Sequence, residues 1–290
     1  MIWSFSRQVW NASQAPAVMG IVNVTPDSFS DGGQFADGDR AAERALQLWS
    51  QGALWVDIGG ESTRPGAQPV SARQEMARVI PVLEKILSLQ KKNCAAEKPG
   101  WISIDTMKGA VAREAVSAGA VVVNDVSGLA DEESMLSLLA ESDCGYVLTH
   151  CQGTPQTMQI NPHYEDCLSQ VLAFFDEKLK ILQRAGVDIE RVVLDPGFGF
   201  GKKWEHNRQL LLGIPKIASL GRPVLVGLSR KSFIGLATGT AASDRLAGTL
   251  AAETLAIWHG AHIVRSHEPG HSVQAALMTR SVFSGQISRK

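Results

Sequence analysis

The chain has 290 residues, of which 44% are hydrophobic and 20% charged, and its formal net charge is −1. These values are typical of a globular protein with a large core, and a near-neutral chain without a basic cluster is not expected to bind nucleic acid. No apolar run approaches the ~20 residues that a membrane span needs, no signal peptide is recognisable at the N-terminus, and the four cysteines show no C-x-x-C spacing. We therefore expect a cytoplasmic protein with reduced thiols and no membrane association.

The first signal along the chain is a series of short apolar segments rich in β-branched residues. Several of them are apolar throughout rather than alternating, which is typical of parallel strands that helices cover on the outside. The predicted strands are residues 18–24, 54–58, 101–104, 121–124, 146–149, 192–194, 223–227 and 262–265.

Longer segments with a helical period lie between these strands. Met76, Val79, Ile80 and Leu83, for example, recur at three- and four-residue spacing, as expected of a helix with one apolar face. The predicted helices are residues 40–51, 72–90, 109–118, 132–140, 164–185, 207–218, 244–258 and 273–283.

Strand and helix therefore alternate eight times. Right-handed crossovers between parallel strands then favour either a closed (β/α)8 barrel or an open doubly wound sheet. Residues 18–290 contain no linker, low-complexity segment or change of composition, so we predict an α/β protein with a single (β/α)8 TIM barrel. We expect residues 1–17 to form an N-terminal segment that covers the bottom of this barrel.

Polar residues gather where the predicted strands end. Asn23, Asp57, Asp105, Asn124 and Asp195 end strands one, two, three, four and six. A single Asp or Asn at such a position is as often the N-cap of the next helix. Five of them converge on the C-terminal mouth, which is where barrel enzymes bind their ligands, and we interpret them as a polar ligand site.

Three cations occupy the same end of the barrel. Arg64 follows strand two, Lys231 follows strand seven, and Arg265 lies on strand eight. Cations from three strand ends favour an anionic ligand, with phosphate as the best candidate, and the loops after strands seven and eight are the usual phosphate corner of this fold.

The loop after strand six, residues 197–202, does not have the spacing of a nucleotide-binding phosphate loop. We interpret it as a mobile glycine-rich loop that carries Phe198 and Phe200. His150 and His267 have no partner at metal-ligand spacing, so a hydrogen-bonding role is favoured over a zinc site.

Four segments together resemble the signatures of the bacterial dihydropteroate synthases, a family of pterin-binding enzymes. They are residues 19–33 (MGIVNVTPDSFSDGG), 57–67 (DIGGESTRPGA), 195–202 (DPGFGFGK) and 229–232 (SRKS). They occur in the order that the family has, and the similarity extends from about residue 18 to residue 267.

The resemblance implies a (β/α)8 barrel that forms a homodimer. It implies the condensation of 6-hydroxymethyl-7,8-dihydropterin diphosphate with 4-aminobenzoate, which yields 7,8-dihydropteroate and diphosphate in folate biosynthesis. It also implies Mg²⁺ as cofactor, a hard cation that suits oxygen ligands and phosphates, and sulfonamides as competitive inhibitors.

The resemblance also implies a role for individual residues. The catalytic residues would be Asp105, Lys231 and Arg265. Those that bind the pterin would be Asp105, Asn124, Asp195, Lys231 and Arg265. Those that bind the diphosphate would be Asn23, Thr63, Arg265 and His267, with Asn23 also a ligand of Mg²⁺. Those that shape the 4-aminobenzoate pocket would be Phe29, Arg64, Pro65, Phe200 and Ser229.

The chain departs from the family pattern at several positions. Thr149 and Cys151 stand where the family often has methionine, and Met107 replaces a small or hydroxylic residue. Ser266 and Pro269 change the segment after strand eight. We expect these departures to alter substrate affinity and drug sensitivity but not the class of reaction.

Two other functions remain open at this point. A pterin-binding methyltransferase of the methyltetrahydrofolate type would share the barrel and the pterin site, but would not need a diphosphate corner. An inactive pterin-binding paralogue would be favoured by loss of Asn23, Asp105, Asp195 or Lys231, all of which are present. The apolar stripe of Leu246, Leu250 and Leu255 is interpreted as core rather than as an interface.

Overall fold

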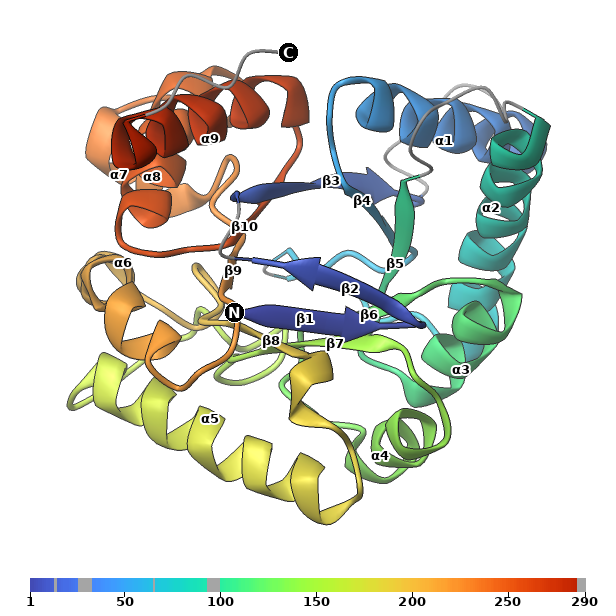
Figure 1. Cartoon of the computed structure of the whole chain (residues 1–290), viewed down its shortest axis with the longest axis horizontal. Coiled ribbons are helices and arrows are strands. Elements are labelled where there is room, and N and C mark those ends of the chain that lie inside the picture. The colour runs from blue at the N-terminus through green and yellow to red at the C-terminus, as the bar shows by residue number, and fades with distance from the viewer. Residues whose placement is uncertain (13–14, 26–32, 65, 93–99, 286–290) are drawn as a thin grey trace.

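The computed structural model describes residues 1–12, 15–25, 33–64, 66–92 and 100–285, of which 33–37 are described by their backbone alone. Eight parallel strands form one sheet in the order β8-β7-β6-β5-β4-β3-β10-β9 (Figure 1). A parallel bridge between Leu194 and Val224 joins the two ends of this order, so the sheet is a nearly closed barrel and the predicted fold class is confirmed. The strands are β3 (Ala17–Asn23), β4 (Trp55–Gly59), β5 (Trp101–Asp105), β6 (Val122–Asp125), β7 (Gly145–Thr149), β8 (Val192–Asp195), β9 (Leu225–Val226) and β10 (Ile263–Ser266).

Helices surround the strands on the outside (Figure 1). They are α1 (Gly33–Ser50), α2 (Ala72–Lys92), α3 (Gly109–Ala118), α4 (Glu132–Glu141), α5 (Cys167–Arg184), α6 (Trp204–Ala218), α7 (Ser232–Thr238), α8 (Leu246–Trp258) and α9 (Pro269–Ser284), with 3-10 turns η2 (Ile189–Arg191) and η3 (Ala242–Asp244). The eight predicted helices are confirmed, whereas α7 is not among them because its seven residues are too few for a recognisable apolar period. No helix in the described part of the chain is long and apolar enough to cross a bilayer.

The core lies between the barrel and this outer layer. Val79, Leu83 and Ile86, one turn apart on α2, are fully or almost fully buried, as their spacing predicts. Residues on the other side of each strand fill the barrel interior, where Met19, Val147 and Ile263 are among those with no exposed surface. Burial on both sides explains why several of the predicted strands are apolar rather than alternating.

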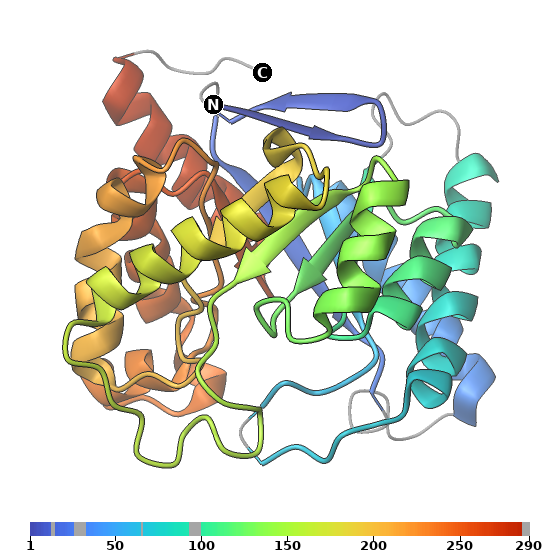
Figure 2. The ribbon, with the colours of Figure 1, turned by 90° about the horizontal axis from the view of Figure 1, so that it is seen from below.

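An antiparallel hairpin of β1 (Ile2–Phe5) and β2 (Gln8–Asn11) lies at one end of the barrel (Figure 2). The buried rings of Trp3 and Phe5 pack on Trp55 and Trp101, which begin β4 and β5. The indole of Trp3 also donates a 2.9 Å hydrogen bond to the carbonyl of Arg191. The sequence does not predict the hairpin, because its strands have four residues each and its turn, Ser6-Arg7, lacks the usual Asn-Gly signal for positive φ.

One prediction about the core is wrong. Leu255 on α8 is 49% exposed, and Leu246 and Leu250 are only partly buried. Helix α8 is apolar around most of its circumference, so a stripe of leucines on this helix does not show which side faces the interior.

Candidate active site

The C-terminal ends of β4, β5, β6 and β10 bring together a connected polar network. Arg265 donates from Nε to Oδ2 of Asp57 and from Nη2 to Oδ2 of Asp105, both at 2.6 Å. The amide of Asn124 donates to the same Asp57 oxygen at 2.8 Å. The strand register explains the contact, since Asp105 of β5 pairs directly with Asn124 of β6 and with Gly59 of β4.

Asp57 is the residue of this network that the sequence placed among the polar strand ends but gave no individual role. It has no exposed surface, and its Oδ2 accepts from both Arg265 and Asn124. The other oxygen, Oδ1, and Oδ1 of Asn124 are buried without a hydrogen-bond partner. Unpartnered buried acceptors cost free energy, so these two oxygens are well suited to accept N–H groups from a ligand.

Asp105 has the electrostatics of a functional group rather than of a helix cap. Burial raises its pKa to about 7, while Arg265 acts to lower the pKa and Asp57 to raise it. The N-terminus of α3 is held by a different residue, because the backbone N–H of Gly109 donates to Asp131 at 2.8 Å. Capping therefore does not account for Asp105.

Asp195 ends β8 and faces a lysine across the mouth. Its Oδ1 accepts from the N–H of Gly197 at 2.7 Å, and burial raises its pKa to about 6. Lys231, at the start of α7, has its pKa lowered to about 8 by burial, against the attraction of Asp195. The Nζ of Lys231 lies 4.0 Å from the centre of the Phe200 ring, a cation–π contact.

The end of β10 joins the segment after β9 through a histidine. Nδ1 of His267 lies 2.9 Å from Oγ of Ser229, whose oxygen also accepts from the His267 backbone N–H. Burial, followed by the charges of Arg265 and Arg230, lowers the pKa of His267 to about 3. The imidazole is therefore neutral at physiological pH and offers a ring N–H or lone pair rather than a full charge.

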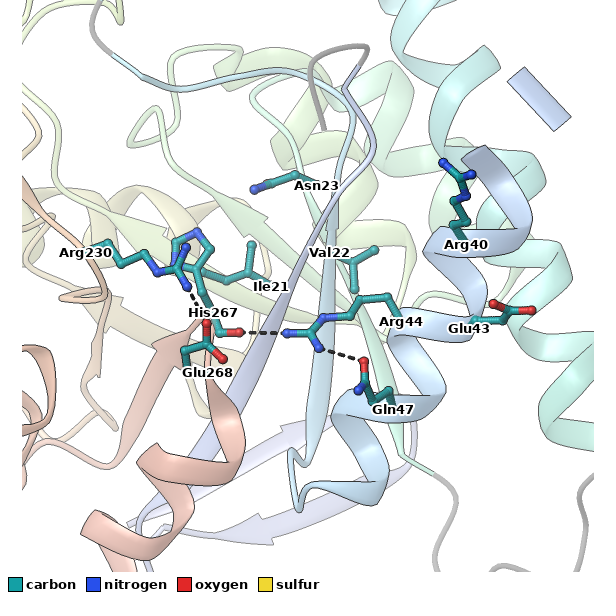
Figure 3. A pocket seen from close by; sticks show the side chains of 10 residues that line it. All are labelled: Ile21, Val22, Asn23, Arg40, Glu43, Arg44, Gln47, Arg230, His267 and Glu268. Atoms are coloured by element: carbon teal, nitrogen blue, oxygen red, sulfur yellow. Dashed lines mark hydrogen bonds and ion pairs between the residues drawn. The ribbon is translucent and has the colours of Figure 1, made fainter. Parts of the chain in front are cut away.

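A cavity of about 650 Å³ lies beside His267, between α1 and the β10–α9 connection (Figure 3). Asn23 and His267 line it together with Arg44 and Arg230. Arg44 donates to the carbonyl of His267 at 2.9 Å, and Arg230 pairs with Glu268. Arg40 lines the cavity as well, and so do the carboxylates of Glu43 and Glu268. Three arginines thus outnumber two glutamates, a small excess of positive charge that suits an anionic ligand.

Asn23 could hold a cation only with help from a ligand. The described residues contain no cluster of three or more His, Cys, Asp or Glu side chains that could hold a metal ion. The half-buried amide of Asn23 is a hard oxygen donor on the cavity wall. A Mg²⁺ ion there would take its remaining ligands from phosphate oxygens and water, as this ion commonly does.

The other residues assigned to diphosphate and aminobenzoate lie on the loop after β4 or outside the described chain. Thr63 is half-buried and Arg64 exposed, outside the Asp57–Arg265 network, although the charge of Arg64 helps to lower the pKa of His267. Phe29 and Pro65 lie outside the described residues.

The glycine-rich loop differs from its prediction. Phe198 is 1% exposed and belongs to the core, while only Phe200 lies beside Lys231. Lys202 is buried and donates to the carbonyl of Phe200 at 2.9 Å, and its Nζ lies 3.0 Å from Nδ1 of His150. This lysine anchors the loop, a role that its position after a run of glycines does not predict.

Three of the residues that depart from the family pattern have distinct local environments. Oγ of Ser266 accepts from the hydroxyl of Ser272 at 2.8 Å and from the N–H of Glu268 at 3.2 Å, and Pro269 is the first residue of α9. Thr149 is fully buried, and its hydroxyl has no hydrogen-bond partner.

Comparison with known proteins gives a consistent result. The family model described as "Pterin binding enzyme" matches residues 19–267. The dihydropteroate synthase of Escherichia coli (strain K12) is 42% identical over 275 residues, which cover 95% of this chain and 94% of that one. The structure of the Xanthomonas albilineans dihydropteroate synthase with 4-aminobenzoic acid has a TM-score of 0.87 at 41% identity, covering 96% and 97% of the two chains. The Yersinia pestis enzyme in a sulfonamide drug complex has a TM-score of 0.88 at 39% identity, covering 98% and 100%.

Proposed function

Since the chain belongs to the family of pterin-binding enzymes, we propose that it condenses 6-hydroxymethyl-7,8-dihydropterin diphosphate with 4-aminobenzoate to give 7,8-dihydropteroate and diphosphate. The observation that carries the proposal is the Asp57–Asn124–Arg265–Asp105 network. It combines buried, unpartnered acceptors with a cation at the mouth of the barrel. A pterin presents N–H donors on one edge and, in this substrate, a diphosphate at its other end.

The pterin would lie across the mouth. Asn124 and Asp195 would accept the N–H groups of its amino-pyrimidinone edge, and a carboxylate that receives two parallel N–H bonds gives selectivity as well as affinity. Lys231 and Arg265 would lie against the ring, and Asp105 would face it. Arg265 is already oriented by Asp57 and Asp105, so little side-chain entropy remains to be lost on binding.

The reaction breaks the C–O bond between the methylene carbon and diphosphate, and forms a C–N bond from that carbon to the arylamine, which loses a proton. Positive charge spreads into the pterin ring as diphosphate departs. Asp105 would stabilise this charge, with Lys231 and Arg265 completing the catalytic set.

Asn23, Thr63, Arg265 and His267 would hold the diphosphate. Mg²⁺, bound by Asn23 and the phosphate oxygens, would neutralise charge on the leaving group. Phe200, Arg64 and Ser229 would shape the 4-aminobenzoate pocket with Phe29 and Pro65, and a sulfonamide would compete there because it resembles the arylamine.

A homodimer is part of the same proposal. Helices α7, α8 and α9 present an apolar face in which Trp258 and Phe283 stack with ring centres 4.4 Å apart while each is more than half exposed. Leu236, Leu255, Met278 and Val282 are also exposed on these helices. Several large apolar side chains exposed on neighbouring helices are typical of subunit interfaces. At the opposite end of the chain, residues 1–17 are proposed to cover the bottom of the barrel rather than to form a domain.

The experiment is to incubate the purified chain with both substrates and Mg²⁺, and to measure diphosphate release together with dihydropteroate formation. We expect diphosphate release that requires 4-aminobenzoate and that a sulfonamide inhibits competitively. Pterin binding without release would indicate an inactive paralogue. Turnover of methyltetrahydrofolate instead would indicate a methyltransferase, and either result would contradict the proposal.

A further inference from the structure

A buried ion cluster lies outside the residues assigned to either substrate. Lys108, three residues after Asp105, donates to Oε2 of Glu61 and, at 2.6 Å, to Oε2 of Glu75. Glu75, in the first turn of α2, has no exposed surface, and its other oxygen has no hydrogen-bond partner. Burial opposes the charge of Lys108, but the two carboxylates outweigh it and raise the pKa of the lysine. A cation held between two buried carboxylates is costly to assemble, which suggests a specific task.

The cluster closes the base of the loop between β4 and α2. Glu61, at the start of this loop, accepts from the N–H of Val70 at its end, at 3.1 Å, through the oxygen that does not contact Lys108. One carboxylate therefore joins the two ends of the 61–70 segment and ties both to Lys108.

The same loop is also docked on α2. Arg78 donates to the carbonyl of Gly60 at 2.7 Å. A Cβ at Gly60 would lie 2.7 Å from Val79 and 3.1 Å from Glu75, so no side chain fits between the loop and the helix. The close packing of Gly60 on α2 and the Lys108–Glu61–Glu75 cluster therefore fix the position of the base of the loop.

The loop between these anchored ends carries Thr63, which is half-buried, and Arg64, which is exposed. Neither side chain is fixed by surrounding packing, so their positions follow from the backbone of the loop. The cluster holds its ends, and residues 155 and 156 contact its middle, where the N–H of Gly66 donates to the carbonyl of Pro155 at 3.1 Å and the amide of Gln156 donates to the carbonyl of Ala67 at 3.0 Å. The loop crosses the end of the barrel opposite the β1–β2 hairpin, where its cyan ribbon is seen at the bottom of Figure 2.

We propose that Lys108 and Glu61 are positioning residues for the arylamine substrate. Their ion pair fixes the position of the 61–70 loop and with it the affinity for 4-aminobenzoate. This inference rests on the proposed function. Neither residue is among the proposed substrate contacts. The residues proposed to bind the pterin lie on β5, β6, β8 and β10 and at the start of α7, outside the 61–70 loop.

The first test is Lys108→Met. The KM for 4-aminobenzoate is expected to rise about 10- to 100-fold, because small misplacement of positioning groups has effects of this size, while the KM for the pterin diphosphate changes less than about twofold. Lys85→Met is the matched control. Lys85 lies further along α2 and forms an exposed ion pair with Asp39 of α1. Lys108→Arg keeps the cation and should recover most of the affinity.

A second variant separates positioning from folding, because Lys108→Met leaves Glu75 buried without its cation. Lys108→Met with Glu75→Gln removes that charge and should recover the melting temperature but not the KM for 4-aminobenzoate. An equal rise in both KM values, or recovery of the KM in the double variant, would overturn the proposal.

Amide hydrogen exchange provides a readout that needs no activity. The segment containing Val70 should exchange faster in Glu61→Gln and in Lys108→Met than in the wild type or Lys85→Met, and unchanged exchange would overturn the proposal. If the wild type released no diphosphate while exchange responded as expected, the proposed reaction would fail and the anchoring of the loop would stand.

Discussion

Nη2 of Arg265 lies 2.6 Å from Oδ2 of Asp105, although 160 residues separate the two in the chain. Asp57 holds Nε of the same guanidinium at an equal distance. One cation is therefore shared by two buried carboxylates, so Arg265 does not fully neutralise the pair and Asp105 can present negative charge next to where a pterin ring would lie. Such a site is preorganised to stabilise positive charge that develops on the ring.

Asp105→Asn is expected to lower kcat by about 10²–10³-fold while changing the dissociation constant of the pterin diphosphate far less. The neutral ground-state ring gains little from the carboxylate, whereas the transition state gains much. Steady-state kinetics and calorimetry on the same preparation would measure both. Asp131→Asn is the control: Asp131 accepts from Gly109 at the start of α3, and since asparagine caps a helix about as well as aspartate, both stability and turnover should change little. Near-normal turnover in Asp105→Asn would remove this residue from the catalytic set.

The dependence of kcat/KM on pH is expected to be a narrow bell. The acid side follows Asp105, whose pKa is about 7, because its anionic form is lost as the pH falls. The alkaline side follows Lys231, whose pKa is about 8, because its cation is lost as the pH rises. Lys231→Arg should move the alkaline limb upward, since a guanidinium stays charged. An alkaline limb that is the same in both proteins would exclude Lys231 as its source.

Asp195→Asn is expected to weaken binding of the pterin diphosphate by at least about 100-fold and to leave the fold intact. The amide oxygen can still accept from Gly197, so the glycine-rich loop keeps its anchor. The amide NH₂ would instead face the pterin donors, and each unpaired buried donor costs about 1–3 kcal/mol. Calorimetry measures the affinity and circular dichroism the fold, and unchanged affinity would show that Asp195 does not bind the pterin.

Glu253→Gln is expected to flatten the dependence of stability on pH. Burial raises the pKa of Glu253 from 4.5 to about 7, and the hydroxyls of Ser272 and Ser266 only partly oppose the shift. The folded state thus binds the proton more tightly than the unfolded state, so this stabilisation is complete below pH 4.5 and is lost as the pH rises to about 7. The shift corresponds to a loss of about 3 kcal/mol in the free energy of unfolding.

Denaturant unfolding at pH 5 and pH 8 would measure this loss. The difference in free energy of unfolding between the two pH values should shrink in Glu253→Gln, and should be unaltered in Glu133→Gln, which changes an exposed glutamate on α4. If Glu253→Gln keeps the wild-type difference, Glu253 is not the titrating group.

Leu255→Glu is expected to convert the proposed homodimer into monomers, because a charge would be buried in the apolar face of α7, α8 and α9. Light scattering after size-exclusion chromatography would report the mass. Val9→Glu is the control, since Val9 is 68% exposed but lies on the hairpin. A wild-type chain that is already monomeric, or a Leu255→Glu chain that remains dimeric, would contradict the assignment of this face.

Much of this molecule is determined locally by the sequence. The eightfold alternation predicted the barrel because the apolar period of each strand and helix is a property of a few neighbouring residues. The ends of the strands could be located in the same way, and parallel strands in a barrel must end at one mouth. Asp105, Asn124 and Asp195 were therefore predicted at one end without knowledge of any contact, and the contiguous motifs at 19–33, 57–67 and 195–202 indicated the family.

The tertiary structure decided what depends on residues far apart in the chain. Asp57 was placed in the polar ligand site by the sequence but received no individual role, because its importance comes from Arg265, 208 residues away. Lys202 becomes an anchor only beside His150, and Lys108 only where Glu61 and Glu75 meet it. Leu255 was wrongly assigned to the core, because α8 is apolar on both sides and its sequence does not show which side faces the interior. Apolar periods and motifs are encoded along the chain, whereas ion pairs and exposed faces exist only once the ring of strands has closed and brought distant residues into contact.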